Sequence, residues 1–178
     1  PNFTFDIKRA FEIINFSKLP VDAHLMIEDP DSIAPRYAQT GCNSVTFHLE
    51  AVSNVLQTIS DIKSNGAKVG IAIKPATKFS EVEPFIEKID MLLIMTVEPG
   101  FGGQSFMNNQ LLKVKEIKKL SENKSLTLDI GVDGGVDDIT GPLCINAGAN
   151  VLIAGSYLFK QENLINATNE LNKKFHNV

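Results

Sequence analysis

Two polar side chains stand on alternating, strand-like runs of the sequence: His24 in VDAHLMI and Asp133 at the end of LTLDIGVD. Period-two alternation places each of them on the face opposite a row of aliphatic residues. A carboxylate on an inward face is costly to bury unless it binds a metal, pairs with a cation or transfers protons. Asp133 is therefore expected to serve a site, whereas His24, taken alone, is more simply explained as a hydrogen-bonded core histidine.

Helix capping is the competing explanation for Asp133. Gly134 and Gly135 separate it from a helix expected to begin near Asp138, and Asp137 is better placed to cap that helix. The position of Asp133 therefore favours metal binding or proton transfer over capping.

Three glycine-containing loops follow strand-like runs. The first is EPGFGGQSF at residues 98–106, and the others are Gly134-Gly135 and Gly155-Ser156. Glycine lets backbone N–H groups approach an anion closely, and (β/α) barrels often bind phosphate with the loops after their last two strands. The sequence contains neither GxGxxG nor GK[ST], so the usual fingerprints of dinucleotide and nucleoside triphosphate binding are missing. Together, the three loops predict a phosphorylated ligand.

Four further residues give weaker signals. His48 ends one strand-like run and Lys74 follows the next, so either side chain is a candidate to face a ligand. The alternative for His48 is a hydrogen bond within the core, and the alternative for Lys74 is exposure to solvent. Met26 and Met95 are placed to pack over an apolar part of a substrate, although methionine more often fills a core.

Short apolar runs alternate with amphipathic stretches along the whole chain, a pattern typical of parallel sheets with crossover helices. Strands are expected at residues 21–27, 44–48, 68–73, 91–97, 126–132 and 150–154. Helices are expected at about 32–40, 52–65, 80–88, 110–121, 138–146 and 163–175, with Gly41, Gly66 and Gly148 at helix ends. No linker interrupts the pattern, so residues 1–178 are expected to form a single α/β domain. Six strands fit an open doubly wound sheet, which the length favours, or part of an eight-stranded barrel, which the motifs favour.

Composition excludes several classes of protein. The 17 Lys and Arg residues against 21 Asp and Glu give a net charge of −4 without a basic block, which argues against binding to nucleic acid or to an anionic membrane. The longest apolar runs are far shorter than the roughly 20 residues that span a bilayer. Two isolated cysteines, Cys42 and Cys144, make neither a disulfide framework nor a CxxC metal site, so a reducing cytoplasm is the expected compartment.

Six segments, in order along nearly the whole chain, closely resemble the ribulose-phosphate 3-epimerase family. They are VDAHLMIEDP (21–30), TFHLEA (46–51), AIKPAT (72–77), MTVEPGFGGQSFM (95–107), VDGGV (132–136) and AGS (154–156). MTVEPGFGGQSFM is specific to this family and its near relatives, whereas VDGGV is shared with other phosphate-binding barrels. The resemblance therefore rests on the whole set.

This resemblance implies a (β/α)8 TIM barrel that interconverts D-ribulose 5-phosphate and D-xylulose 5-phosphate in the pentose phosphate pathway, acting as a homo-oligomer. It also implies a divalent metal, zinc by expectation with Fe2+, Mn2+ and Co2+ as alternatives, beside two acid/base aspartates. Matched by motif, His24 and Asp133 are expected to bind the metal, and Asp133 also to transfer protons. The residues expected to contact substrate or its phosphate are His24, Met26, Met95, Gly100, Phe101, Gly102, Gly103, Gly134, Gly135, Gly155 and Ser156.

One part of the family pattern does not occur in these 178 residues. The family's first two strands, with a metal-binding His and the partner Asp in an HxDxMDG segment, are expected before residues 1–18, which resemble the stretch leading into the second helix. Half of the expected metal ligands and one acid/base carboxylate are therefore missing from the sequence. Gly131 also stands where the family carries a longer polar residue, so an inward contact is expected to be lost.

Several interpretations remain open at this point. The chain is an epimerase represented in part, or a noncatalytic phosphosugar-binding barrel fragment that another chain completes, or an allulose-6-phosphate 3-epimerase. A hexulose-phosphate synthase or a decarboxylase is disfavoured because no DxKxxD-like strand occurs. The unpaired edges of strands 21–27 and 150–154 predict association or aggregation of this chain.

Overall fold

The computed structural model describes residues 4–100 and 103–176, which form one curved, parallel six-stranded sheet. The strands are β1 (Asp22–Leu25), β2 (Ser44–His48), β3 (Lys68–Ile73), β4 (Met91–Met95), β5 (Asp129–Asp133) and β6 (Val151–Ile153). Each strand pairs with the next one along the chain, in the order β1-β2-β3-β4-β5-β6. A doubly wound sheet reverses its strand order at a switch point, whereas a barrel does not. The unbroken order therefore decides for a partial barrel.

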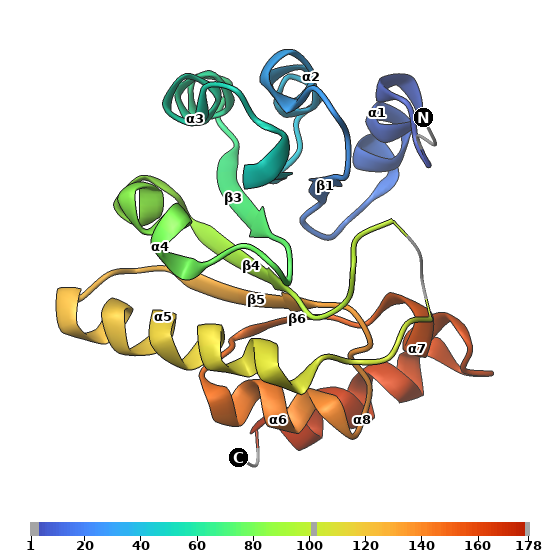
Figure 1. Ribbon diagram of the computed structural model, residues 1–178. Helices are drawn as coiled ribbons and strands as arrows, with labels where there is room; N and C mark the ends of the chain where they lie inside the picture. The colour runs from blue at the N-terminus through green and yellow to red at the C-terminus, as the bar shows by residue number, and fades with distance from the viewer. Residues whose placement is uncertain (1–3, 101–102, 177–178) are drawn as a thin grey trace.

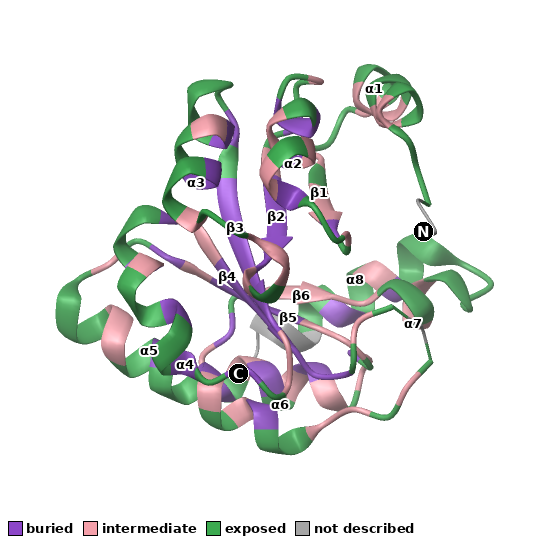
Figure 2. Ribbon diagram, turned by 45° about the horizontal axis from the view of Figure 1, so that its top comes forward, coloured by how far each residue is buried: buried purple, intermediate pink, exposed green. Residues whose placement is uncertain are grey.

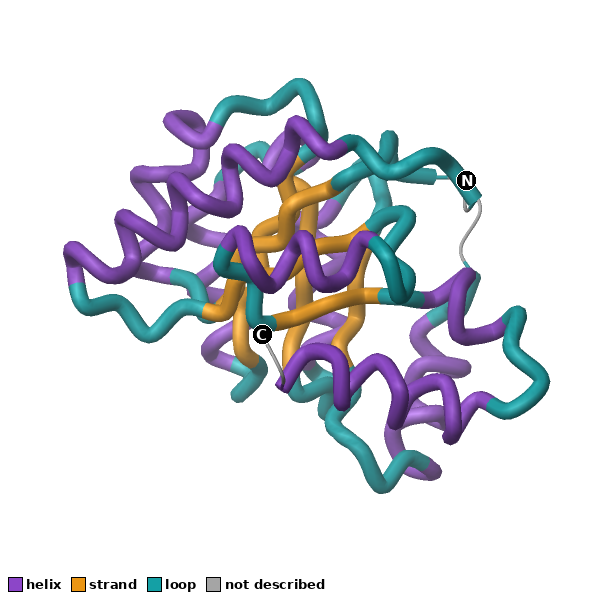
Figure 3. The backbone as a smooth tube through the Cα atoms, turned by 90° about the horizontal axis from the view of Figure 1, so that it is seen from below, coloured by secondary structure: helices purple, strands orange, loops and turns teal. Residues whose placement is uncertain are grey.

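Helices line the outer side of this sheet (Figures 1 and 3). The α-helices are α1 (Ile7–Phe16), α2 (Pro30–Ala38), α3 (Val55–Ser64), α4 (Phe79–Val82), α5 (Leu111–Lys124), α6 (Thr140–Ala147), α7 (Gly155–Phe159) and α8 (Leu164–His176). Short 3-10 helices lie at η1 (Leu49–Ala51), η2 (Glu83–Lys88) and η3 (Asn108–Gln110). No helix of the described residues is both long and apolar enough to cross a membrane.

The strands bury side chains on both faces, in two separate clusters. Figure 2 shows the buried residues, in purple, along the strands in the middle of the molecule. The main core lies between sheet and helices and includes Val45, Phe47, Ile71, Leu92 and Ile94. A smaller cluster lies on the inner face and consists of Ala72, Leu93, Met95 and Val97, with Ile153 packed against it. This inner cluster forms the floor beneath the carboxyl ends of the strands.

The six predicted strands agree with the structure in number and order and differ at their bounds, whereas the helices differ in number as well. Strands 44–48 and 68–73 end where expected, whereas β1, β4 and β6 are shorter and β5 begins only at Asp129. The helix expected at 80–88 is split into α4 and η2, because Pro84 lacks a backbone N–H and restricts the residue before it. Two helices, α1 and α7, were not among those expected with bounds.

Candidate active site

The carboxyl ends of the strands surround a cavity of about 700 Å³. It is lined by most of the residues that the sequence singled out: Met26, Met95, Gly100, Gly103, Asp133, Gly134, Gly135, Gly155 and Ser156. Phe101 and Gly102 lie outside the described residues. His24 does not line this cavity, but its ring lies beside Asp133 on the floor.

Backbone turns without side chains form the wall after β5. Gly134 has φ +114°, and a Cβ atom there would meet Val97 Cγ2 at 2.5 Å. Gly135 has φ +66°, and a Cβ atom there would lie 3.1 Å from the backbone nitrogen of Phe106. The turn after β5 is therefore packed directly against the side chain of Val97 and the backbone of Phe106, and the positive φ angles at both positions favour glycine.

Capping of the next turn is done by Asp137, as the spacing predicted. Its Oδ1 accepts hydrogen bonds from the N–H groups of Ile139 at 2.9 Å and Thr140 at 2.8 Å. The carboxylate of Asp133 takes no part in this cap and lines the cavity instead.

His24 approaches Asp133 from the opposite strand. Its Nδ1 lies 3.5 Å from Asp133 Oδ2, and its Nε2 lies 3.0 Å from Nε2 of His48. The two imidazole planes are inclined by only 19° and their centroids are 5.1 Å apart. Because this separation is nearly the largest that a 3.0 Å contact between ring nitrogens permits, the rings meet edge to edge in a hydrogen bond. His24 thus makes the hydrogen bond that the core-histidine interpretation predicts, and its other ring nitrogen lies beside Asp133.

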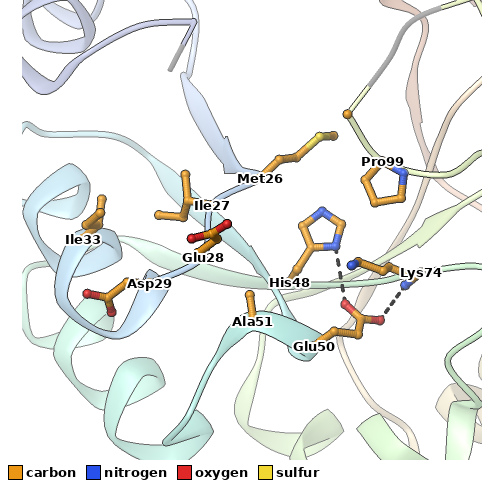
Figure 4. A pocket seen from close by; sticks show the side chains of 11 residues that line it. Met26, Ile27, Glu28, Asp29, Ile33, His48, Glu50, Ala51, Lys74 and Pro99 are labelled. Carbon is orange, nitrogen blue, oxygen red and sulfur yellow. Dashed lines mark hydrogen bonds and ion pairs between the residues drawn. The ribbon is translucent and has the colours of Figure 1, made fainter. Parts of the chain in front are cut away.

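Behind His48 lies a carboxylate that the sequence analysis did not single out. Glu50 Oε2 lies 3.5 Å from His48 Nδ1, and Glu50 Oε1 accepts a hydrogen bond from the backbone N–H of Lys74 at 2.7 Å (Figure 4). The same Oε1 also accepts a hydrogen bond from the hydroxyl of Thr77. Burial alone would raise the pKa of Glu50, but the contacts from His48, Thr77 and the Lys74 N–H outweigh it and lower that pKa to about 2. Glu50 is therefore a fixed negative charge.

The distance between His24 and Asp133 can be compared with the spacing of two ligands around a metal ion. Two ligands of a tetrahedral zinc ion, each about 2.0–2.2 Å from it, lie about 3.4 Å apart. The 3.5 Å between His24 Nδ1 and Asp133 Oδ2 fits such a pair. Within the described residues no group of three or more His, Cys, Asp or Glu gathers to hold a metal, so this pair supplies part of a ligand set.

The four residues with weaker signals, His48, Lys74, Met26 and Met95, differ in burial and in the cavity they line. His48 is 3% exposed and binds His24 rather than standing at the mouth of the cavity. Lys74 lines an adjoining cavity of about 670 Å³ together with Met26, His48 and Glu50. Met26 is 45% exposed there, whereas Met95 is buried at 1% and belongs to the floor.

The contact expected to be lost at Gly131 is replaced by packing. A Cβ atom at Gly131 would lie 2.8 Å from Leu93 Cδ1, so the leucine fills the space of a longer inward side chain. The sequence analysis also missed Thr140, Tyr157, Lys160 and Gln161, which line the main cavity. Three of these belong to α7 or directly follow it, a helix too short to be detected from periodicity.

Comparison with known proteins gives a consistent result. The model of the ribulose-phosphate 3 epimerase family matches residues 1–159. Ribulose-phosphate 3-epimerase of Bacillus subtilis is 40% identical over 172 residues, which cover 96% of this chain and 79% of the relative. The enzyme of that name from Mycobacterium tuberculosis is 39% identical over 159 residues, covering 89% and 69%.

Solved structures with a similar fold are more distant in sequence. A crystal structure of 3-hexulose-6-phosphate synthase superposes with a TM-score of 0.74 at 17% identity, covering 94% of this chain and 80% of that one. KGPDC from Streptococcus mutans superposes with a TM-score of 0.76 at 14% identity, covering 95% and 78%. At these identities the likeness concerns the fold alone.

Proposed function

Because the chain belongs to the ribulose-phosphate 3-epimerase family, we propose that it carries the phosphate-binding end and one acid/base carboxylate of a ketose-phosphate 3-epimerase. The reaction is the interconversion of D-ribulose 5-phosphate and D-xylulose 5-phosphate. One observation supports this above the others: Asp133 and the Gly134-Gly135 turn line the same cavity as Gly155 and Ser156. A single phosphosugar can therefore contact a proton-transferring group and a backbone anion site at once.

Phosphate binding falls to the backbone turns and to one cation. Gly100 and Gly103 both have positive φ, and among the described residues beyond their chain neighbours no atom lies within 4 Å of a notional Cβ, which leaves their backbone accessible to an anion. Lys160 lines the same cavity and adds a positive charge. The phosphate is thus held at the end of the cavity formed by the β4, β5 and β6 loops.

Proton transfer at C3 falls to Asp133. The C–H bond next to a carbonyl is too weakly acidic at neutral pH unless the charge that develops on oxygen is stabilised. His24 and Asp133 would hold a divalent cation, zinc by expectation, which would supply that positive charge beside the enediolate oxygens. Met26 and Met95 line the cavity with apolar surface that keeps water from the reacting carbons.

Inversion at C3 also needs a carboxylate on the opposite face of the substrate. The family resemblance places it in an HxDxMDG segment, which the 178 residues do not contain. We propose that residues 1–178 form one domain, the part of a (β/α)8 barrel whose edge strands β1 and β6 receive the remaining strands.

The half-reaction of Asp133 can be tested on this chain as it stands. Each ketose phosphate is incubated with the protein and zinc in D2O, and exchange of the C3 proton and formation of the other epimer are followed by NMR, with and without a chelator. We expect C3 exchange with at least one epimer, lost in Asp133→Asn and reduced by chelation.

The matched control is Asp129→Asn, because Asp129 lies on the same face of β5 at its amino end and binds Asn150 there. Exchange that survives Asp133→Asn, or that Asp129→Asn abolishes equally, would contradict the role of Asp133. Net epimerisation by the chain alone would show that it supplies both acid/base groups itself.

A further inference from the structure

Four side chains form one continuous line across the inner face of the sheet. Asp133 on β5 faces His24 on β1 at 3.5 Å, His24 faces His48 on β2 at 3.0 Å, and His48 faces Glu50 in η1 at 3.5 Å. His48 is 3% exposed, and its Nδ1 makes no hydrogen bond of good geometry within the described part of the chain, Glu50 being the carboxylate beside it. The function proposed above uses only the first two members of this line.

The orientation of Glu50 is fixed on its far side. Its Oε1 accepts from the backbone N–H of Lys74 and from the hydroxyl of Thr77, so Oε2 is the oxygen left for His48 (Figure 4). An ionised carboxylate only accepts hydrogen bonds. A neutral His48 ring therefore carries its proton on Nδ1, because a bare nitrogen would face a negative oxygen.

The state of His48 decides the state of His24. With its proton on Nδ1, neutral His48 has an unprotonated Nε2 that can only accept. The 3.0 Å contact between the two Nε2 atoms then requires His24 to be the donor. A neutral His24 that donates from Nε2 has a bare Nδ1, and this nitrogen faces Asp133. Both carboxylates would favour a proton on the Nδ1 that faces them, but the single Nε2–Nε2 contact allows only one of the two rings to have it. Glu50 decides, because Lys74 and Thr77 fix it beside a ring that is 3% exposed, whereas Asp133 lines the open cavity, where water can solvate its carboxylate.

We propose that Glu50 and His48 are positioning residues that select the tautomer of His24, leaving its Nδ1 lone pair directed toward Asp133. This inference rests on the proposed function for the meaning of that lone pair, which is a ligand position beside a carboxylate. The tautomer itself is independent of any activity. Ligating histidines commonly donate their other N–H to an acceptor that fixes the ring, and the acceptor here is a second imidazole.

The tautomers can be measured directly because the chain has only three histidines. The metal-free 178-residue protein, labelled with 15N in the imidazoles, is studied at about pH 9, so that the 15N shifts report the neutral tautomers. A His176→Gln variant identifies the signals of the third ring, and correlation of each remaining ring with its own backbone assigns His24 and His48. We expect the Nε2–H tautomer at His24 and the Nδ1–H tautomer at His48, and the opposite assignment at either ring overturns the inference.

Glu50→Gln gives a sharper test, because it reverses donor and acceptor along the row of side chains from residue 50 to His24 while keeping the size of the side chain. The Lys74 N–H and the Thr77 hydroxyl continue to donate to the oxygen of the new amide, so the NH2 group of the amide points at His48 Nδ1. His48 must then carry its proton on Nε2 and donate to His24, which moves the His24 proton to Nδ1. We expect both tautomers to switch in this variant and zinc affinity to fall about 10- to 100-fold.

Glu81→Gln is the matched control. It makes the same carboxylate-to-amide change at an exposed residue whose contact is the backbone N–H of Lys78. We expect wild-type tautomers and zinc affinity. If wild-type tautomers persist in Glu50→Gln, the inference fails even when the protein binds zinc and exchanges C3 protons. If the wild-type tautomers are as expected but neither zinc binding nor exchange is found, the inference about the tautomer holds and the proposed function fails.

Discussion

Thr96 donates its backbone N–H to the carbonyl oxygen of Asp133 at 2.8 Å, and its hydroxyl lies 2.9 Å from the same oxygen. The hydroxyl also contacts the carbonyl oxygen of Gly134. Thr96 is fully buried directly after β4. The position of Asp133 and of the glycine turn after it therefore depends on a side chain that directly follows the neighbouring strand.

Replacing Thr96 by valine keeps the shape of the side chain and removes the hydroxyl. We expect the free energy of unfolding to fall by about 1–2 kcal/mol, because a buried carbonyl oxygen loses a donor. Binding of inorganic phosphate should weaken as the turn loosens. Urea denaturation and calorimetric phosphate titration measure the two effects.

Thr58→Val provides the comparison. Thr58 is buried to the same degree and its hydroxyl contacts Asp31 Oδ1 and the carbonyl of Asn54, away from the cavity. Its loss should lower stability similarly and leave phosphate binding unchanged. Equal weakening of phosphate binding in both variants would show that Thr96 acts only through overall stability.

Gly134→Ala should be among the most damaging single-methyl additions in the chain. Its φ of +114° is strained for alanine, at roughly 1–2 kcal/mol, and the methyl group would overlap Val97, at roughly 1–3 kcal/mol more. Gly66→Ala separates the two contributions, because Gly66 has φ +83° and open space around it. Urea denaturation that shows equal losses for both variants would mean that Val97 moves aside without cost.

The low pKa of Glu50 predicts a particular dependence of stability on pH. A carboxyl whose folded pKa is about 2, against an ordinary 4.5, stabilises the fold fully above about pH 4.5 and loses that contribution as the pH falls toward 2. The contribution is on the order of 3 kcal/mol. Glu50→Gln should therefore be less stable than wild type at pH 7, and the difference should shrink by pH 3. A difference that stays constant across this range in urea denaturation would contradict the assignment.

The two edge strands predict self-association of the chain. Among the described residues, β1 and β6 each pair with a strand on one side only. Near β1, the side chains of Phe16 and Leu19 are 91% and 77% exposed. Open strand edges beside exposed apolar surface favour association. Sedimentation velocity should show oligomers that grow with concentration, and a monodisperse monomer that unfolds cooperatively at high concentration would refute this.

The sequence predicted the fold well where its signal is periodic. Alternation along β5 predicted that Asp133 faces inward, and the structure has it lining the cavity, together with the loop glycines at the carboxyl ends of the strands. What the sequence could not show is contact between strands far apart in the chain. His48 and Glu50 are spaced like any residues at the end of a strand. The pairing of β1 with β2 brings His48 to His24, and only the curvature of the sheet brings His24 on β1 to Asp133 on β5.

Short elements were the other weak point. α7 has five residues, and η1 has three, so neither repeats long enough to show a helical period. The cavity residues that these elements carry, among them Lys160 and Glu50, were missed for that reason. The sequence offered one signal for these residues: each follows a predicted strand closely, and in a barrel the loops after the strands surround the site.

Lys160 offers a last test of where the phosphate binds. It is an exposed cation at the end of α7 and lines the same cavity as Gly134, Gly155 and Ser156. Because an exposed ion pair contributes about 0.2–1 kcal/mol, Lys160→Met should weaken binding of inorganic phosphate by roughly 1.5- to 5-fold. The weakening should diminish at high salt, where exposed charges are screened.

Lys119→Met removes the same charge from the exposed side of α5 and should change the affinity little. Equal effects of the two variants in calorimetric titration would mean that net charge, rather than a cation at this end of the cavity, governs phosphate binding.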